Sequence, residues 1–98
     1  DLKNNKTIQL SDVFMDINKV DWNKILMKNF KNPDQKEMLL DDKIHINNNF
    51  YFDSQNITFV YNQYEITAYA AGVVEISIPF AELKPYLKPE FISRNNIK

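Results

Sequence analysis

Large apolar residues recur at helical spacing early in the chain. Four of them stand at offsets of zero, three, four and eight, namely Trp22, Ile25, Leu26 and Phe30. This spacing places them on one face of a helix, and Asp21 directly before them can accept a hydrogen bond from the first turn. We therefore expect a helix from about residue 22 to 30 that packs this face on the core.

Shorter helical pieces are expected on both sides of it. Ile8 and Leu10 alternate with polar neighbours as in a short half-buried strand, and Ser11 can cap a helical piece with one apolar face, made by Val13, Phe14 and Ile17. Residues 16–19 are expected to form a loop. Proline disfavours helix at the preceding residue but fits the first helical position, so a further short helix is expected to begin at Asn32-Pro33.

Alternation of period two marks the second half of the chain. Ile44 and Ile46 flank His45 in a short strand or loop, and residues 50–52 and 57–61 read as a hairpin with a turn between them. Residues 73–78 form a third strand, which Pro79 ends. One helical turn is expected near residues 81–84, then a kink or restart at Pro85 and an end at Pro89.

Helices followed by strands predict an α+β fold, with the helices packed on one face of a small antiparallel sheet. The 98 residues, with a mass of 11.6 kDa, allow a single domain with one modest core. We expect that domain to span residues 7–92, with flexible ends at residues 1–6 and 93–98.

Composition excludes several function classes. The 12 Lys and Arg residues nearly balance the 13 Asp and Glu residues, and no long run of one sign exists, which argues against nucleic-acid binding. The absence of cysteine excludes disulfides and thiolate chemistry. No apolar run approaches the roughly 18 residues of a membrane span. Because the chain begins at Asp1, we expect that a leader, an anchor or a preceding domain has been removed, and that any membrane attachment would come from that missing part.

The most distinctive stretch is the segment from Tyr64 to Gly72, which we call the central segment. It joins two predicted strands, yet it is longer than a tight turn and consists of aromatic and small residues. Such a connection needs a packed shape of its own, which either supports the fold or meets a ligand. We expect Glu65 to accept hydrogen bonds from loop amides and Gly72 to supply a positive φ, while Tyr64 and Tyr69 are equally suited to anchoring and to ligand contact.

Catalytic arrangements are scarce. His45 has no second histidine or cysteine for a metal site, and a single glycine leaves no Gly-rich phosphate loop, so no cofactor is expected. Glu65 and Glu75 are the best carboxylate pair for a glycan-acting enzyme, because they flank the central segment. For Glu65, however, the hydrogen-bonding role is favoured over catalysis.

Several stretches of the chain resemble a C-terminal domain of unknown function, namely residues 8–14, 49–52, 57–66, 69–72 and 76–83. That domain is found in RsiV-type proteins, which are membrane-anchored bacterial anti-sigma factors. It is also found in PdaC-type peptidoglycan deacetylases. The resemblance implies a fold related to a fragment of the heat-shock-cognate ATPase, and an extracytoplasmic module without catalytic residues. In RsiV the domain captures lysozyme. The positions that match the family's central motif are Tyr64, Glu65, Ile66, Tyr69, Ala70, Ala71 and Gly72. Ala68 stands where the family commonly has proline.

These observations predict a non-enzymatic, extracytoplasmic bacterial binding or sensor domain. The expected partner is a lysozyme-like cell-wall hydrolase or peptidoglycan, and the expected contact residues are Tyr64, Glu65 and Tyr69 together with the small residues Ala70, Ala71 and Gly72. Two alternatives stay open: a glycan-acting enzyme that uses the Glu65 and Glu75 pair, and a structural spacer domain of a larger surface protein.

Overall fold

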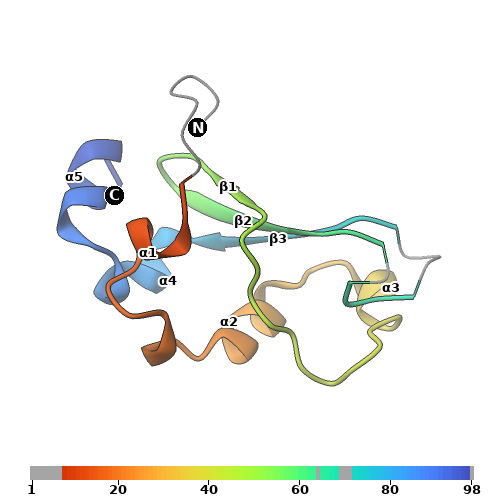
Figure 1. Cartoon of the computed structure of the whole chain (residues 1–98). Coiled ribbons are helices and arrows are strands. Elements are labelled where there is room, and N and C mark those ends of the chain that lie inside the picture. The colour runs from red at the N-terminus through yellow and green to blue at the C-terminus, as the bar shows by residue number, and fades with distance from the viewer. Residues whose placement is uncertain (1–7, 64, 69–71, 98) are drawn as a thin grey trace.

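A computed structural model gives the structure of the protein and describes residues 8–63, 65–68 and 72–97 (Figure 1). Helices and strands follow one another in the order α1 (Leu10–Val13), η2 (Ile17–Lys19), α2 (Trp22–Asn29), α3 (Pro33–Lys36), β1 (Phe50–Phe52), β2 (Asn56–Tyr61), β3 (Val74–Pro79), α4 (Phe80–Leu83), η4 (Lys84–Tyr86) and α5 (Pro89–Asn95). The two η elements are single turns of 3₁₀ helix.

The three strands form one antiparallel sheet in the order β1-β2-β3. Phe59 at the centre of β2 pairs with Phe50 on one side and with Ile76 on the other. The β1–β2 turn is held by Asp53, whose Oδ1 accepts from the backbone N–H of Gln55 at 2.8 Å and of Asn56 at 2.7 Å. These two hydrogen bonds lower the pKa of the Asp53 carboxyl.

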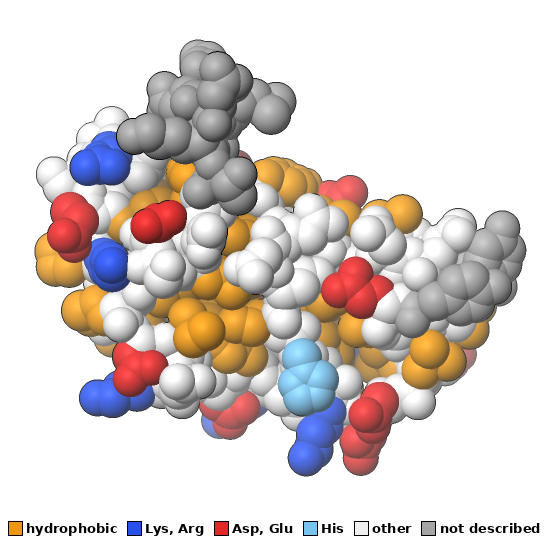
Figure 2. Space-filling view, viewed as in Figure 1, with side chains coloured by type: hydrophobic (Ala, Val, Ile, Leu, Met, Phe, Trp, Pro, Cys, Tyr) orange, Lys and Arg blue, Asp and Glu red, His pale blue; other side chains and the backbone are white. Residues whose placement is uncertain are grey.

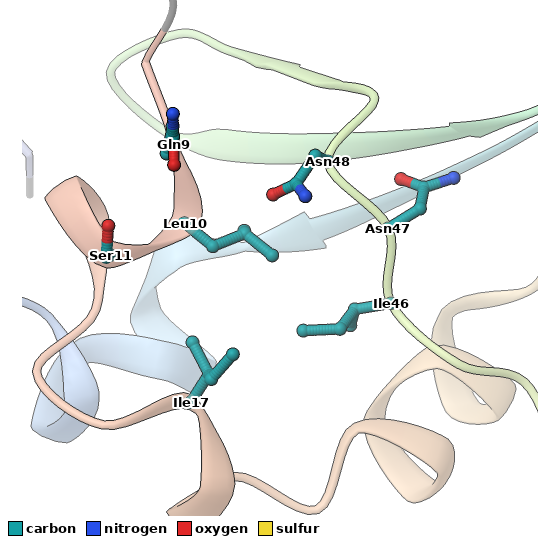
Figure 3. Close-up of a pocket in the computed structure, with 7 residues that line it drawn as sticks. All are labelled: Gln9, Leu10, Ser11, Ile17, Ile46, Asn47 and Asn48. Atoms are coloured by element: carbon teal, nitrogen blue, oxygen red, sulfur yellow. The ribbon is translucent and has the colours of Figure 1, made fainter.

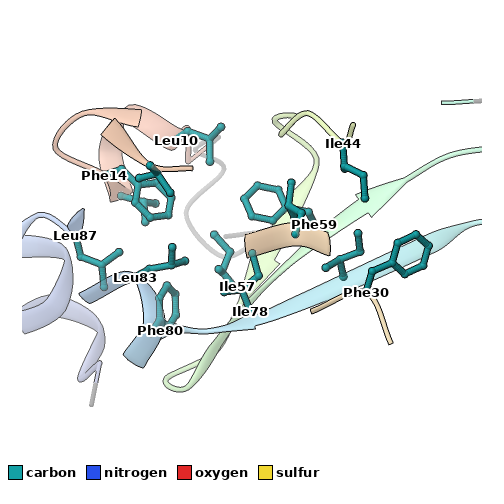
Figure 4. Close-up of a cluster of buried hydrophobic side chains, with 14 of the residues drawn as sticks. Leu10, Phe14, Phe30, Ile44, Ile57, Phe59, Ile78, Phe80, Leu83 and Leu87 are labelled. Carbon is teal, nitrogen blue, oxygen red and sulfur yellow. The ribbon is translucent and has the colours of Figure 1, made fainter. Parts of the chain in front are cut away.

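The core lies between one face of the sheet and the helices (Figure 4). Alternate residues of β2 and β3 point into it and are fully buried, namely Ile57, Phe59, Tyr61, Val74, Ile76 and Ile78. Trp22 at the start of α2 meets Phe59 edge-on, with ring centroids 5.7 Å apart, and Phe14 at 5.1 Å. The expected helical face of α2 is thus the one that covers the sheet, and the predicted α+β fold is confirmed.

Three local predictions near the N-terminus are wrong. Leu10 begins helix α1 instead of lying in a strand, and Gln9, not Ser11, is the N-cap. Asp12 favours this turn because its Oδ2 accepts from the Gln9 N–H at 2.9 Å. Residues 17–19 form the turn η2, since Asp16 caps them by accepting from the Asn18 N–H at 3.0 Å.

The segment around His45 contains no strand. The Ile44 N–H donates to Asn23 Oδ1 of α2 at 2.8 Å, so the backbone of this stretch bonds to a helix side chain and does not join the ladder of the sheet. Ile44 is nevertheless buried, which explains its apolar character. His45 itself is exposed, and its carbonyl accepts the Tyr61 hydroxyl at 2.9 Å.

The C-terminal helices agree with the prediction up to residue 86 and differ after it. Helix α4 is one turn, and the chain restarts as η4, which contains Pro85, so the expected restart near this proline is found. The expected end at Pro89 is wrong, because Pro89 occupies the first turn of α5, where its missing N–H costs nothing. Helix α5 runs to Asn95 and Ile97 is buried, so packed structure continues past residue 92. The flexibility of the two ends stays a prediction.

Candidate functional site

The central segment is only partly within the described residues. Tyr64, Tyr69, Ala70 and Ala71 lie outside them, so the contact roles expected for these four stay predictions. Residues 65–68 and Gly72 are described, and they define how the segment leaves β2 and how it enters β3.

Glu65 forms the first brace of the segment. Its Oε1 accepts from the Asn62 N–H at 3.0 Å, and its Oε2 accepts from Asn47 Nδ2 at 2.9 Å. The same Asn47 amide donates to the carbonyl of Val60 at 2.8 Å, while Asn47 Oδ1 accepts from the Asn49 N–H at 2.9 Å. The carboxylate therefore connects the turn after β2 to the loop before β1, which is the hydrogen-bonding role expected for it.

Residues 66–68 form the second brace, by pairing with the chain that follows α3. Ala68 donates its N–H to the Met38 carbonyl at 2.9 Å, and Leu40 donates to the Ile66 carbonyl at 2.9 Å. Between these bonds, Leu39 and Thr67 form an antiparallel bridge. Thr67 is fully buried, and its hydroxyl has no hydrogen-bond partner among the described residues.

Gly72 marks the exit of the segment. Its φ is +72°, which confirms the expected positive value. A Cβ built at this glycine would meet nothing within 4 Å, so the backbone conformation and not close packing requires glycine here. At the next residue, Gln35 of α3 donates from Nε2 to the Val73 carbonyl at 3.1 Å.

Glu75, the other member of the predicted carboxylate pair, lies on the outer face of the sheet. It is exposed, and its Oε1 accepts the Tyr51 hydroxyl at 2.6 Å across β2. This hydrogen bond is the main cause that raises the pKa of the Tyr51 phenol. Glu65 and Glu75 each have a separate partner, and neither lines the pocket described next.

A pocket of about 320 Å³ opens between α1, η2 and the loop before β1 (Figure 3). Its lining combines aliphatic and uncharged polar side chains, namely Gln9, Leu10, Ser11, Ile17, Ile46, Asn47 and Asn48. On the sequence, residues 47–49 read only as a loop, and the three contributing segments show no shared motif. Sequence reasoning therefore missed this pocket.

The space-filling view places the pocket in its surroundings (Figure 2). Hydrophobic side chains gather on this face between α1 and the loop before β1, and acidic and basic side chains are interspersed around them. The pocket of Figure 3 thus lies in a mixed surface.

Neither a metal centre nor a membrane span is found in the part of the chain that the structure describes. It contains no group of three or more His, Asp or Glu side chains placed to hold a metal ion. No described helix has the length and apolar character that crossing a membrane requires.

Known proteins and families that are similar to this chain match it over most of its length. A protein of the DUF3298 family from Bacteroides fragilis, known from a crystal structure, is similar to this chain, with a TM-score of 0.68 and 28% sequence identity. The similarity covers 97% of this chain but 41% of that protein, so the chain spans about two fifths of the length of its structural relative. No functionally curated protein matches the chain.

The family profile described as "Protein of unknown function (DUF3298)" matches residues 3–81. The expected membership in a family of unknown function is confirmed at this level, while the RsiV-type and PdaC-type relationships and the ATPase-like fold stay predictions. The matched range includes the central segment and the pocket lining, and on this ground the chain belongs to the DUF3298 family.

Proposed function

We propose that this chain is a non-enzymatic binding or sensor domain that acts outside the bacterial cytoplasm. Its partner is a lysozyme-like cell-wall hydrolase or peptidoglycan, and the central segment provides the contact. The observation that carries the proposal is the double brace of that segment, which fixes its first half, residues 65–68, independently of any ligand.

The brace reduces the entropy lost on binding. Glu65 attaches the start of the segment to the Asn47 loop, and Ala68 attaches it to the chain after α3. A connection that is already fixed over part of its length loses less conformational freedom when it meets a partner than a flexible one does. The resemblance to the RsiV-type domain, which captures lysozyme, suggests the class of partner.

Ala68 is a position at which this chain differs from the RsiV-type family. Its N–H donates to the Met38 carbonyl at 2.9 Å, a bond that proline cannot make. This chain therefore fixes the position by a hydrogen bond where relatives use the stiffness of a proline ring. We propose that the contact surface is preserved by this different means.

We assign no catalytic role to Glu65 and Glu75. Each carboxylate is already engaged, by the Asn47 amide and by the Tyr51 hydroxyl respectively, and the two belong to separate hydrogen-bond groups. A glycosidase pair instead faces a shared substrate space, with carboxyl groups roughly 5 to 9.5 Å apart.

The direct test is isothermal titration calorimetry of the chain against lysozyme and against soluble peptidoglycan fragments. Saturable heat with one of them is expected, and Tyr69→Ala should weaken it at least about tenfold. The matched control is Tyr51→Ala, which removes an exposed tyrosine outside the central segment and should leave binding unchanged. Absence of heat with both ligands would overturn the proposal.

Circular dichroism of Tyr69→Ala separates binding from folding. A folded variant with lost binding supports the contact role of the central segment. If the variant unfolds, Tyr64→Ala takes its place in the same titration. A result in which neither folded tyrosine variant changes the binding heat would refute the assignment of the contact to this segment.

A further inference from the structure

We propose that the pocket between α1, η2 and the loop before β1 binds an uncharged peptide segment by one aliphatic side chain. This inference goes beyond the partner proposed above and does not depend on it, because no described residue of the central segment lines the pocket.

The floor of the pocket is aliphatic. Leu10, Ile17 and Ile46 come from three separate segments and converge on the same space in Figure 3. Leu10 is buried, whereas Ile17 and Ile46 remain partly accessible, so apolar surface is available to a ligand. The natural complement of such a floor is a branched aliphatic group such as a leucine side chain.

The rim supplies hydrogen-bonding groups of the kind that a peptide backbone needs. Ser11 and Asn48 are exposed, and their side chains have no hydrogen-bond partner among the described residues. A hydroxyl can donate and accept, and an amide side chain offers both an N–H and a C=O. Together they match the alternating carbonyl and N–H groups of an extended segment.

One wall of the pocket is fixed in advance. Asn47 is bonded to the Val60 carbonyl, to Glu65 Oε2 and to the Asn49 N–H, at 2.8, 2.9 and 2.9 Å. A side chain held by three hydrogen bonds keeps its rotamer, so ligand binding does not have to order it.

Charge selects the class of ligand. The seven described lining residues include no Asp, Glu, Lys, Arg or His, so a charged group would gain no ionic partner among them. The lining also includes no aromatic ring on which a sugar could stack, which favours a peptide over a glycan. A volume of about 320 Å³ accommodates one side chain with its flanking amides.

The test uses the full chain with ¹³C-labelled methyl groups and capped tripeptides observed by NMR. Acetyl-alanyl-leucyl-alanine amide should shift the methyl signals of Leu10, Ile17 and Ile46 saturably. The same peptide with glutamate or lysine at its centre should bind at least about tenfold more weakly. N-acetylglucosamine should cause no saturable shift.

Three variants locate the effect. Ile17→Ala shrinks the floor, and at about fourfold for each methylene of contact it should weaken binding by tenfold or more. Asn48→Ala removes an exposed amide and should weaken binding about fivefold. Ser93→Ala, an exposed position on α5 outside the lining, is the matched control and should have no effect.

Several results would overturn the inference. These are no saturable shift with the leucine peptide, equal affinity for all the peptides, or binding of the sugar in place of the peptide. Methyl shifts that follow dilution of the protein alone would assign the pocket to a second copy of the chain. If Ile17→Ala fails to fold, Asn48→Ala decides, because its side chain is exposed and makes no internal hydrogen bond among the described residues.

Discussion

The orphan hydroxyl of Thr67 gives the sharpest stability prediction. Thr67 is fully buried beside the braced part of the central segment, and its Oγ1 has no hydrogen-bond partner in the described part of the chain. An unsatisfied buried polar group costs about 1–3 kcal/mol. Thr67→Val keeps the β-branched shape and replaces the hydroxyl by a methyl group. We expect the variant to be more stable than the parent by about 1 kcal/mol.

The same substitution at Thr58 is the matched control. Thr58 is also buried, at 4% exposure, but its Oγ1 lies 2.7 Å from Ser77 Oγ and shares a hydrogen bond with it. Thr58→Val removes that bond, whose net contribution is about 1 kcal/mol. Ser77 is exposed and can turn to water, so no further penalty is expected. The two variants should thus differ by about 2 kcal/mol, with opposite signs relative to the parent.

Urea denaturation followed by circular dichroism measures both free energies of unfolding, provided that the m-value is unchanged. For a domain of this size, 1 kcal/mol corresponds to about 4–8 °C in Tm, so a thermal scan gives a second readout. If Thr67→Val destabilises the protein as much as Thr58→Val does, the Thr67 hydroxyl has a partner such as an ordered water, and the reasoning is refuted.

Three further predictions concern single side chains. Gly72→Ala should lower the free energy of unfolding by about 1–2 kcal/mol in urea, because alanine is strained at a φ of +72°, and an unchanged midpoint would contradict that φ. Phe59→Ala should cost about 3–5 kcal/mol by the same measurement, since Phe59 is fully buried against Trp22; a loss below 1 kcal/mol would contradict that packing. Burial raises the pKa of Tyr61, with the Glu65 charge adding to the effect, so the folded state keeps a proton that the unfolded state releases above about pH 10. Stability should therefore fall as pH rises past 10 in the parent and fall less in Tyr61→Phe; parallel pH profiles of unfolding would contradict this.

The spacing of apolar and polar residues correctly predicted the helices and strands that bury the apolar face of their own sequence. The apolar face of α2, the β1–β2 hairpin and the restart at Pro85 follow from spacing, turn chemistry and proline geometry within a few residues. The positive φ at Gly72 belongs to the same class, because glycine is the residue that reaches it without strain. Such features depend on neighbours in the chain and can be read from them.

Some local sequence patterns are compatible with two different structures, and for these only the tertiary structure shows which one forms. Proline both ends a helix and begins one, and at Pro89 it begins α5. Ile44 and Ile46 alternate like a strand, yet Asn23 of α2 takes the Ile44 N–H. Long-range hydrogen bonds to the side chains of Asn23 and Tyr61 thus hold this segment outside the strand ladder, and alternation carries no information about which partner is near.

The candidate sites likewise have features that the sequence predicted and features that only the tertiary structure revealed. The sequence by itself singled out the central segment, and it assigned Glu65 to loop amides and Gly72 to the exit, because composition and backbone chemistry are local properties. Only the tertiary structure brought Asn47 to Glu65, placed residues 66–68 beside residues 38–40, and joined Leu10, Ile17 and Ile46 into a pocket. These contacts link segments far apart along the chain, and they form because burial of the common core brings the segments together, which no short stretch of sequence encodes.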